Sequence, residues 1–274
     1  MREPFTMTSS DMIPPGVVGG AGELGDRIRS APGLLAGFDF DGTLAPIRVD
    51  PDVPQLSPEI ERSLATLSTR RLVRVVVISG RALDDLAERI PIEGVDLAGN
   101  HGLELRLDGQ RTVPEEVKQH HTTVRKAART FRSELSDIPG CRVEDKGLTL
   151  SVHVRETPAD RLTDVRRLVT DTVAGTPGLT LSEGKQVFEV SPNVPYDKGT
   201  AISQLASETP ADWLALCLGD DTTDEDAFRA IQPDGVGIHV GSNTETAARY
   251  RLPDQSDVPA FLCWLVENIP VHDA

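Results

Sequence analysis

The sequence predicts an α/β fold in which a Rossmann-like core with a parallel sheet is interrupted by an inserted α+β unit. Short apolar runs alternate with helical patterns up to about residue 112, and the alternation returns after residue 192. Residues 113–191 instead follow the order helix, hairpin, helix, hairpin. Strands that alternate with helices favour a parallel, doubly wound sheet, whereas successive hairpins favour an antiparallel one. We therefore expect a discontinuous core of residues 22–112 and 192–274, with a cap of residues 113–191 inserted into it.

The core elements are predicted from apolar runs and their flanking residues. An uncharged run starting at Leu34 predicts a buried strand that ends in Asp39-Phe40-Asp41. Pro58 suits the first position of a helix that begins at Ser57. The further expected ranges are a helix to residue 70, a strand over 72–78, a helix to residue 90, a strand near 95–98, a helix over 198–207, strands over 213–218 and 236–240, and a helix over 258–268.

The inserted unit is predicted to present a polar sheet face. We expect helices over 115–136 and 159–173 and hairpins over 141–155, turning at Lys146-Gly147, and 179–190, turning near 183–184. Alternation in the second arm of the first hairpin puts Leu148, Leu150, Val152 and Val154 on one face and Thr149, Ser151, His153 and Arg155 on the other. Lys185 and Glu189 share a face of the last strand. With both helices on the apolar side, the polar face is expected to lie open, as a lid over a polar ligand.

Composition excludes several classes of protein. The formal net charge of −15 argues against a nucleic-acid or anionic-membrane surface. The longest apolar runs fall short of the roughly 20 residues that span a bilayer, and no secretory signal is evident. Cys141, Cys217 and Cys263 are few and widely spaced, as in a reduced cytoplasmic protein. Residues 1–21, rich in Gly, Pro and Ser, are expected to form a flexible leader.

Reactive side chains follow the predicted core strands. Asp39 and Asp41 are two positions apart, so their carboxylates point the same way and repel unless a cation or a proton intervenes. With Asp220, which follows a later strand, they offer the oxygen ligands that Mg²⁺ prefers. Asp39 can then attack phosphorus and Asp41 can act as general acid and base. The Ser79 hydroxyl and the Lys198 ammonium can hold phosphoryl oxygens, and the pattern predicts phosphoryl-transfer chemistry.

These four motifs resemble those of the haloacid-dehalogenase-like (HAD) phosphatase superfamily, in the same order. They are Asp39-Phe-Asp41-Gly-Thr43, Ser79, Lys198, and Gly219-Asp220-Asp221-x-x-Asp224. The resemblance covers most of residues 34–269. It implies that Asp39 is the nucleophile and Asp41 the acid and base. It also implies that Mg²⁺ is held by Asp39, the Asp41 carbonyl and Asp220, with Asp221 or Asp224 in support.

A finer resemblance is to the trehalose-6-phosphate phosphatases. It rests on Ser79-Gly-Arg81, Gly99-Asn100-His101-Gly102-x-Glu104, Glu144-Asp-Lys146-Gly-Leu-Thr-Leu150 with His153 and Arg155, Gly184-Lys185-x-x-x-Glu189, and Gly219–Asp226. It implies that the substrate is a sugar phosphate and that the enzyme works alongside a trehalose-6-phosphate synthase. The implied substrate-binding residues are Arg81, Asn100, His101 and Glu104 in the core and Glu144, Lys146, Arg155, Lys185 and Glu189 in the cap.

Other interpretations stay open at this point. His101 can be a turn residue, Glu144 and Lys146 an ion pair at a hairpin tip, and Asp221–Asp226 partly the cap of a helix. The same chemistry would serve a sucrose-phosphate or mannosyl-phosphoglycerate type of substrate. A non-catalytic module that binds a sugar phosphate is the remaining alternative, although a binder has no need of both Asp39 and Asp41.

Overall fold

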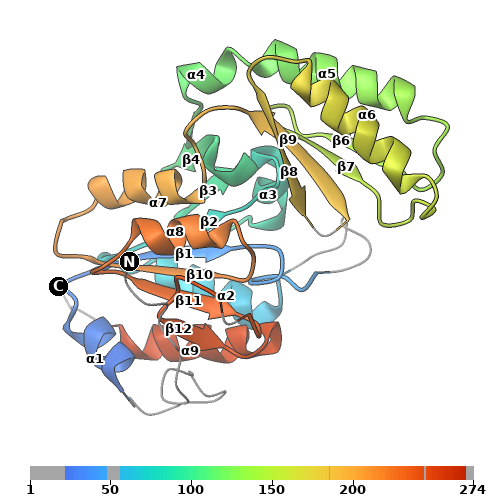
Figure 1. Cartoon of the computed structure of the whole chain (residues 1–274). Helices are drawn as coiled ribbons and strands as arrows, with labels where there is room; N and C mark the ends of the chain where they lie inside the picture. The colour runs from blue at the N-terminus through green and yellow to red at the C-terminus, as the bar shows by residue number, and fades with distance from the viewer. Residues whose placement is uncertain (1–21, 48–55, 185, 244, 270–274) are drawn as a thin grey trace. The chain divides into compact units, whose positions relative to one another are not determined.

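The computed structural model describes residues 22–47, 56–184, 186–243 and 245–269. The chain divides into two compact units, Met1–Arg111 with Tyr196–Ala274, and Thr112–Pro195 (Figure 1). The expected insertion was 113–191. It extends further because its last strand runs to Pro192 and the next helix begins only at Lys198. The expected leader, residues 1–21, lies outside the described residues.

The core unit is built on an eight-stranded sheet. The order is β12 (Tyr250–Leu252), β11 (Val236–Val240), β10 (Leu214–Gly219), β1 (Leu34–Asp39), β2 (Val73–Ile78), β3 (Val95–Gly99), β4 (Glu104–Leu107) and β5 (Gln110–Thr112). Neighbouring strands from β12 to β3 are parallel, and β4 is antiparallel to β3. The predicted α/β class with a parallel core sheet is therefore confirmed.

Helices cover both faces of this sheet (Figure 1). Leu34, Ala36 and Phe38 of β1 pack in one apolar cluster with α1 (Glu23–Ser30), α2 (Pro58–Ser68), α3 (Leu83–Arg89) and α9 (Val258–Asn268). Leu35 of the same strand lies in the opposite cluster with α7 (Lys198–Ser207) and α8 (Asp224–Ala230). Alternate side chains of a strand point to opposite faces, so β1 is buried on both sides. This central burial fixes the strand whose end carries Asp39.

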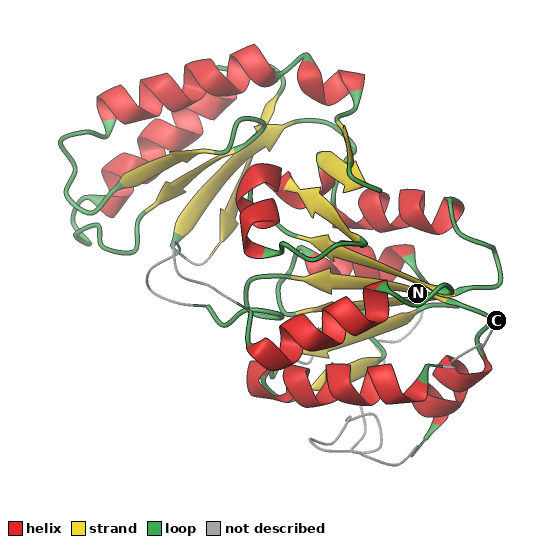
Figure 2. Cartoon of the chain, turned by 180° about the vertical axis from the view of Figure 1, so that it is seen from behind, coloured by secondary structure: helices red, strands yellow, loops and turns green. Residues whose placement is uncertain are grey.

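The inserted unit has a separate core. Its sheet has the order β6 (Arg142–Asp145), β7 (Leu150–His153), β9 (Val187–Pro192), β8 (Leu179–Gly184), with every neighbouring pair antiparallel. Helices α5 (His121–Glu134) and α6 (Leu162–Ala174) pack on it through Phe131 and Val169 together with Val152 (Figure 2). The predicted α+β character of the insertion is confirmed.

Several elements differ from the expectation. The single helix expected over 115–136 is two helices, α4 (Glu115–Lys118) and α5, because the backbone tightens at His120, whose N–H donates to the Val117 carbonyl. The ring of His120 lies where a Cβ on Gly178 would stand, at 2.6 Å. Such a contact between distant residues leaves no trace in the helical periodicity. The sequence pattern did not predict α1, β4, β5, β12 or the short helices η1 (Asn100–Gly102) and η2 (Gln255–Asp257), and it indicated α8 only as the helix that Asp221–Asp226 would partly cap.

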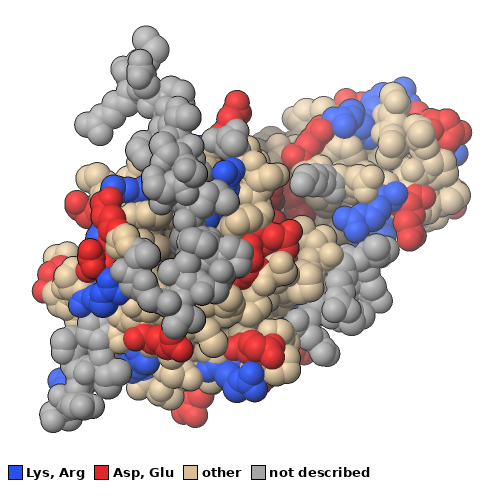
Figure 3. All heavy atoms as spheres, turned by 90° about the horizontal axis from the view of Figure 1, so that it is seen from below, with Lys and Arg blue, Asp and Glu red and all other residues tan. Residues whose placement is uncertain are grey.

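Charge is dispersed on the face drawn in Figure 3, where acidic and basic side chains of the described residues are interspersed. Within the described part of the chain, no helix combines the length and apolar character needed to cross a membrane.

Candidate active site

The carboxyl ends of β1 and β10 form the centre of the candidate site. These strands are parallel neighbours, with Phe38 opposite Leu218, so Asp39 and Asp220 come to the same edge of the sheet. The chain leaves β1 toward β2 on one side, and later reaches β10 on the other. Such a switch in direction is where open α/β sheets bind ligands.

Lys198 joins Asp39 to Asp224. Its ammonium donates to Asp39 Oδ1 at 2.6 Å and to Asp224 Oδ1 at 2.8 Å, and all three side chains are buried. Lys198 is the first residue of α7, and that helix start is fixed by a capping box in which Asp197 and Thr200 exchange hydrogen bonds of 2.7 Å. Burial alone would lower the pKa of Lys198, yet Asp224 and Asp39 raise it above its ordinary value. The lysine is therefore held charged beside the carboxylates.

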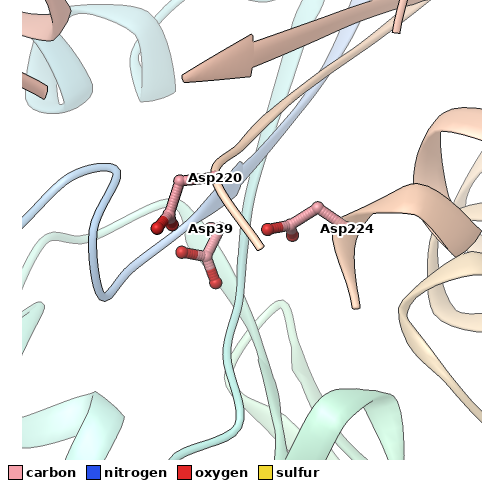
Figure 4. A group of neighbouring side chains, drawn as sticks. All are labelled: Asp39, Asp220 and Asp224. Atoms are coloured by element: carbon pink, nitrogen blue, oxygen red, sulfur yellow. The ribbon is translucent and has the colours of Figure 1, made fainter. Parts of the chain in front are cut away.

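Three carboxylates converge at this point (Figure 4). Asp39, Asp220 and Asp224 each offer an oxygen, and these oxygens lie within 4.8 Å of one another. Burial raises the pKa of Asp39 well above its ordinary value, against the effect of Lys198. Burial and the charge of Asp224 raise the pKa of Asp220 to about 6. One lysine cannot neutralise three converging carboxylates, of which Asp39 and Asp224 are buried and Asp220 is half-buried, so the cluster favours an additional cation.

Two further observations fit a metal ion at this cluster. Asp39 Oδ2 is buried and, among the described residues, has no hydrogen-bond partner. Gly42, at φ 91°, passes so close to Asp220 that a Cβ would lie 2.2 Å from its carboxylate. Thr43, whose role the sequence pattern did not indicate, donates from Oγ1 to Asp220 Oδ1 at 3.2 Å and orients this carboxylate. The cluster can therefore hold a hard cation through oxygen ligands.

Of the two candidates for a supporting acid, Asp224 lies in the cluster. Its Oδ2 accepts from the Asp221 N–H at 3.0 Å. Asp221 is exposed, and its own Oδ1 accepts from the Thr222 N–H at 2.8 Å. Asp221 is absent from the group of converging carboxylates found in the described residues.

Asp41 faces a different cation. Arg81 donates from Nε to Asp41 Oδ2 and from Nη2 to Asp41 Oδ1, both at 2.7 Å, and from Nη1 to Asp85 Oδ2 at 2.9 Å. Its guanidinium also lies 5.5 Å from the centre of the Phe40 ring. The repulsion expected between Asp39 and Asp41 is thus relieved by two separate cations. Arg81 was expected to bind the substrate, and in this structure its guanidinium bonds Asp41, the expected acid and base.

The expected core residues near Ser79 divide into two kinds. Ser79 is buried, and its Oγ accepts from the Arg81 N–H at 3.2 Å. His101 is half-buried, in a left-handed conformation, with its ring against Gly80. Asn100 and Glu104 are fully buried, and both Glu104 oxygens accept hydrogen bonds from protein donors. Both side chains are thus hydrogen-bonded within the core, and their expected contact with the substrate stays a prediction.

The expected residues of the inserted unit form one polar row. Register places Ser151 opposite both Glu144 and Glu189. The Ser151 hydroxyl lies 2.9 and 2.8 Å from the two Glu189 oxygens, and Lys146 Nζ lies 3.5 Å from Oε2 of that glutamate. Side chains of the neighbouring residues form two more pairs, His153 Nε2 with Glu144 Oε2 at 2.7 Å, and Arg155 Nε donating to Gln186 Oε1 at 3.2 Å.

The burial of two residues in this row differs from the expectation, and a third expected residue is not described. Thr149 and Ser151 are buried, so the expected open position is wrong for these two. Ser151 is covered partly because its hydroxyl turns toward Glu189. Lys185 lies outside the described residues.

Comparison with known proteins places the chain in the trehalose-phosphatase family. The family model for trehalose-phosphatase matches residues 37–256. Trehalose-phosphate phosphatase of Mycobacterium marinum is 35% identical over 234 residues, which cover 82% of this chain and 59% of that protein. The Mycobacterium tuberculosis H37Rv protein of the same name is 35% identical over 233 residues, with the same coverage. The chain thus spans 59% of the length of these two curated relatives.

Solved structures give the same result. A trehalose-6-phosphate phosphatase related protein superimposes with a TM-score of 0.77 at 25% identity, covering 85% of this chain and 97% of that one. The C-terminal domain of Candida albicans trehalose-6-phosphate phosphatase superimposes with a TM-score of 0.75 at 25% identity, covering 89% and 95%.

Proposed function

Because the chain belongs to the trehalose-phosphatase family, we propose that it hydrolyses trehalose 6-phosphate to trehalose and phosphate. The family resemblance drawn from the motifs is confirmed. The observation that carries the proposal is the convergence of Asp39, Lys198, Asp220 and Asp224 near the ends of β1 and β10. It combines a carboxylate nucleophile, a fixed cation and a set of oxygen ligands.

We assign Mg²⁺ as the metal. Asp39, Asp220 and the Asp41 carbonyl would hold it, with Asp224 in support, because oxygen ligands without His or Cys suit a hard, small cation. When bound, Mg²⁺ would supply positive charge that offsets the carboxylates and attracts the phosphoryl oxygens. Asp221, at the exposed neighbouring position, is assigned no direct ligation.

Asp39 is the proposed nucleophile. Its carboxylate attacks phosphorus, an O–P bond forms to Asp39, and the bond from phosphorus to the sugar oxygen breaks. Lys198 keeps one oxygen of Asp39 in place and neutralises part of the charge around it. The Ser79 hydroxyl holds a phosphoryl oxygen during this transfer.

Asp41 is the proposed acid and base. It gives a proton to the departing sugar oxygen, then takes one from the water that attacks the phosphorylated Asp39 and releases phosphate. A carboxylate with both oxygens bonded to one guanidinium has no proton to give. Arg81 therefore has to release at least one oxygen when Asp41 acts as the acid.

Glu144, Lys146, Arg155 and Glu189 are the proposed sugar-binding residues, with Lys185 and His101. Carboxylates and amines are suitable partners for sugar hydroxyls. For Glu144 and Glu189 the support is the shared polar row on β6, β7 and β9. We place the protein in the cytoplasm, in keeping with three free cysteines, and acting alongside a trehalose-6-phosphate synthase.

Phosphate release from a panel of sugar phosphates tests this function. Trehalose 6-phosphate, sucrose 6-phosphate and glucose 6-phosphate are compared with Mg²⁺ and with EDTA. Hydrolysis of trehalose 6-phosphate far above the others, stopped by EDTA, is expected. Preference for another sugar would reject the substrate and keep the chemistry, whereas binding without hydrolysis would favour a regulatory module.

A further inference from the structure

A buried carboxylate, Glu104, lies outside the group that the mechanism uses. It is the first residue of β4, opposite Gly99 of β3, and only 1% of it is exposed. Its Oε1 accepts from the Leu83 N–H at 2.9 Å and from Asn100 Nδ2 at 2.6 Å, and its Oε2 accepts from Arg111 Nη2 at 2.6 Å. A buried charge is retained only where donors satisfy it, and both oxygens are satisfied here.

The first partner, Asn100, belongs to a constrained turn. Asn100 and His101 both have positive φ, 49° and 59°, a conformation that side chains other than glycine rarely adopt. Such residues persist where their surroundings hold them. The bond from Asn100 Nδ2 to Glu104 is one such constraint, since it anchors the side chain of the first left-handed residue.

The turn is bonded to the segment that carries Ser79 and Arg81. The Asn100 N–H donates to the Arg81 carbonyl at 2.7 Å, and the His101 N–H donates to the Ser79 carbonyl at 2.9 Å. Between them, a Cβ on Gly80 would lie 2.5 Å from the His101 ring, so turn and segment approach as closely as a glycine allows. A shift of Asn100 therefore moves Ser79 and Arg81.

A second path from Glu104 also ends at Arg81. Helix α3 has no side-chain cap at Ala82, and the Glu104 carboxylate instead accepts from Leu83, the first residue of that helix. The same helix carries Asp85, which accepts from Arg81 Nη1. Glu104 thus fixes both the turn and the helix between which Arg81 is held.

We infer that Glu104 is a positioning residue, which sets the places of Ser79 and Arg81 through the Asn100–His101 turn and does not touch the substrate. The inference rests on the proposed phosphatase function for its effect on activity. Arg111, the last residue of the first core segment, completes the site by bonding Glu104 Oε2 and Asp84.

The test is Glu104→Gln in the full chain. The amide keeps the size of the side chain and removes its charge. Its NH₂ group faces either the Arg111 donor or the Leu83 and Asn100 donors, so at least one of these hydrogen bonds is lost. Asp96→Asn is the matched control, because Asp96 is also buried and accepts from an arginine, Arg74, and from a backbone N–H, Asp108. Asn100→Gly is a milder second variant that removes the donor and tolerates positive φ.

Two readouts separate the inference from the proposed function. Amide hydrogen exchange at residues 79–83 and 99–103 is expected to accelerate in Glu104→Gln and Asn100→Gly but not in Asp96→Asn. The value of kcat/KM of Glu104→Gln and Asn100→Gly is expected to fall by the same factor, roughly 10- to 100-fold, for trehalose 6-phosphate and for p-nitrophenyl phosphate, because Ser79 at the phosphate and Arg81 at Asp41 serve both compounds.

Unchanged exchange would overturn the inference, as would faster exchange with full activity. Loss confined to trehalose 6-phosphate would overturn it too, in favour of sugar contact by Glu104. If the wild-type chain hydrolyses neither compound, the proposed function fails, and the exchange data alone decide whether Glu104 holds the turn.

Discussion

Arg81 holds both carboxylate oxygens of Asp41, with two hydrogen bonds of 2.7 Å from one guanidinium. This fork is planar and cannot be copied by an ammonium. Arg81 therefore fixes the orientation of Asp41, the proposed acid and base.

Arg81→Lys is expected to lower kcat roughly 10- to 100-fold, because a point charge no longer fixes the orientation of Asp41. Steady-state kinetics with trehalose 6-phosphate measures it. Arg89→Lys is the control, since Arg89 bonds both carboxylate oxygens of Asp85 through Nε and Nη2. Equal effects of the two substitutions would contradict an orienting role for Arg81.

Asp39→Asn is expected to remove turnover, by more than roughly 10³-fold, because the amide is no nucleophile. Binding of trehalose 6-phosphate, followed by calorimetry, should survive, since the amide oxygen can still accept from Lys198. Residual magnesium-dependent turnover at the wild-type rate would show that Asp39 is not the nucleophile.

Asp224→Asn is expected to weaken Mg²⁺ binding by roughly 10-fold or more, since the buried supporting carboxylate also orients its neighbours. Asp221→Asn should have a much smaller effect, because Asp221 is exposed and outside the converging group. Calorimetric titration of the metal-free proteins compares them. A larger loss in Asp221→Asn would reverse the assignment.

Gly42→Ala and Gly109→Ala form a matched pair. Both glycines have positive φ, 91° and 77°, so each substitution costs about 1 kcal/mol from backbone strain. At Gly109 a Cβ meets nothing within 4 Å, whereas at Gly42 it meets the Asp220 carboxylate. We expect denaturant unfolding to show a larger loss for Gly42→Ala, and metal titration to show weaker binding in that variant alone. Equal metal affinity in both variants would be inconsistent with a close approach at Asp220.

The Glu144–His153 contact predicts a pH-dependent stability. The hydrogen bond from His153 lowers the pKa of Glu144 from its ordinary value of 4.5, against the effect of burial. A carboxyl group with a lowered folded pKa stabilises the fold above its unfolded pKa, and this stabilisation disappears as pH falls through the folded pKa. The free-energy difference of unfolding between wild type and Glu144→Gln should therefore be present at pH 6 and shrink below about pH 4. A difference that stays constant over this range would contradict the pair.

The sequence predicted those site residues whose positions follow from sheet topology alone. Asp39 and Asp220 follow strands whose apolar runs are plain, and parallel neighbours end at one edge, so their meeting was predictable. The partners of Arg81 and Glu104 were not predictable. Which carboxylate pairs with which donor depends on side-chain orientation and on the left-handed turn at Asn100. Short elements such as β4 and β5 also escaped, since their few residues carry too little periodicity.

The placement of β1 between β2 and β10 has a consequence for synthesis of the protein. Asp39, the proposed nucleophile, precedes Lys198 by 159 positions, and the whole inserted unit is translated between them. Until β10 has left the ribosome, the central strand of the sheet has one unpaired edge, which is a template for wrong pairing. The inserted unit, with its own core, can complete its folding during that interval. The nascent core is then expected to need protection by chaperones until its second half emerges.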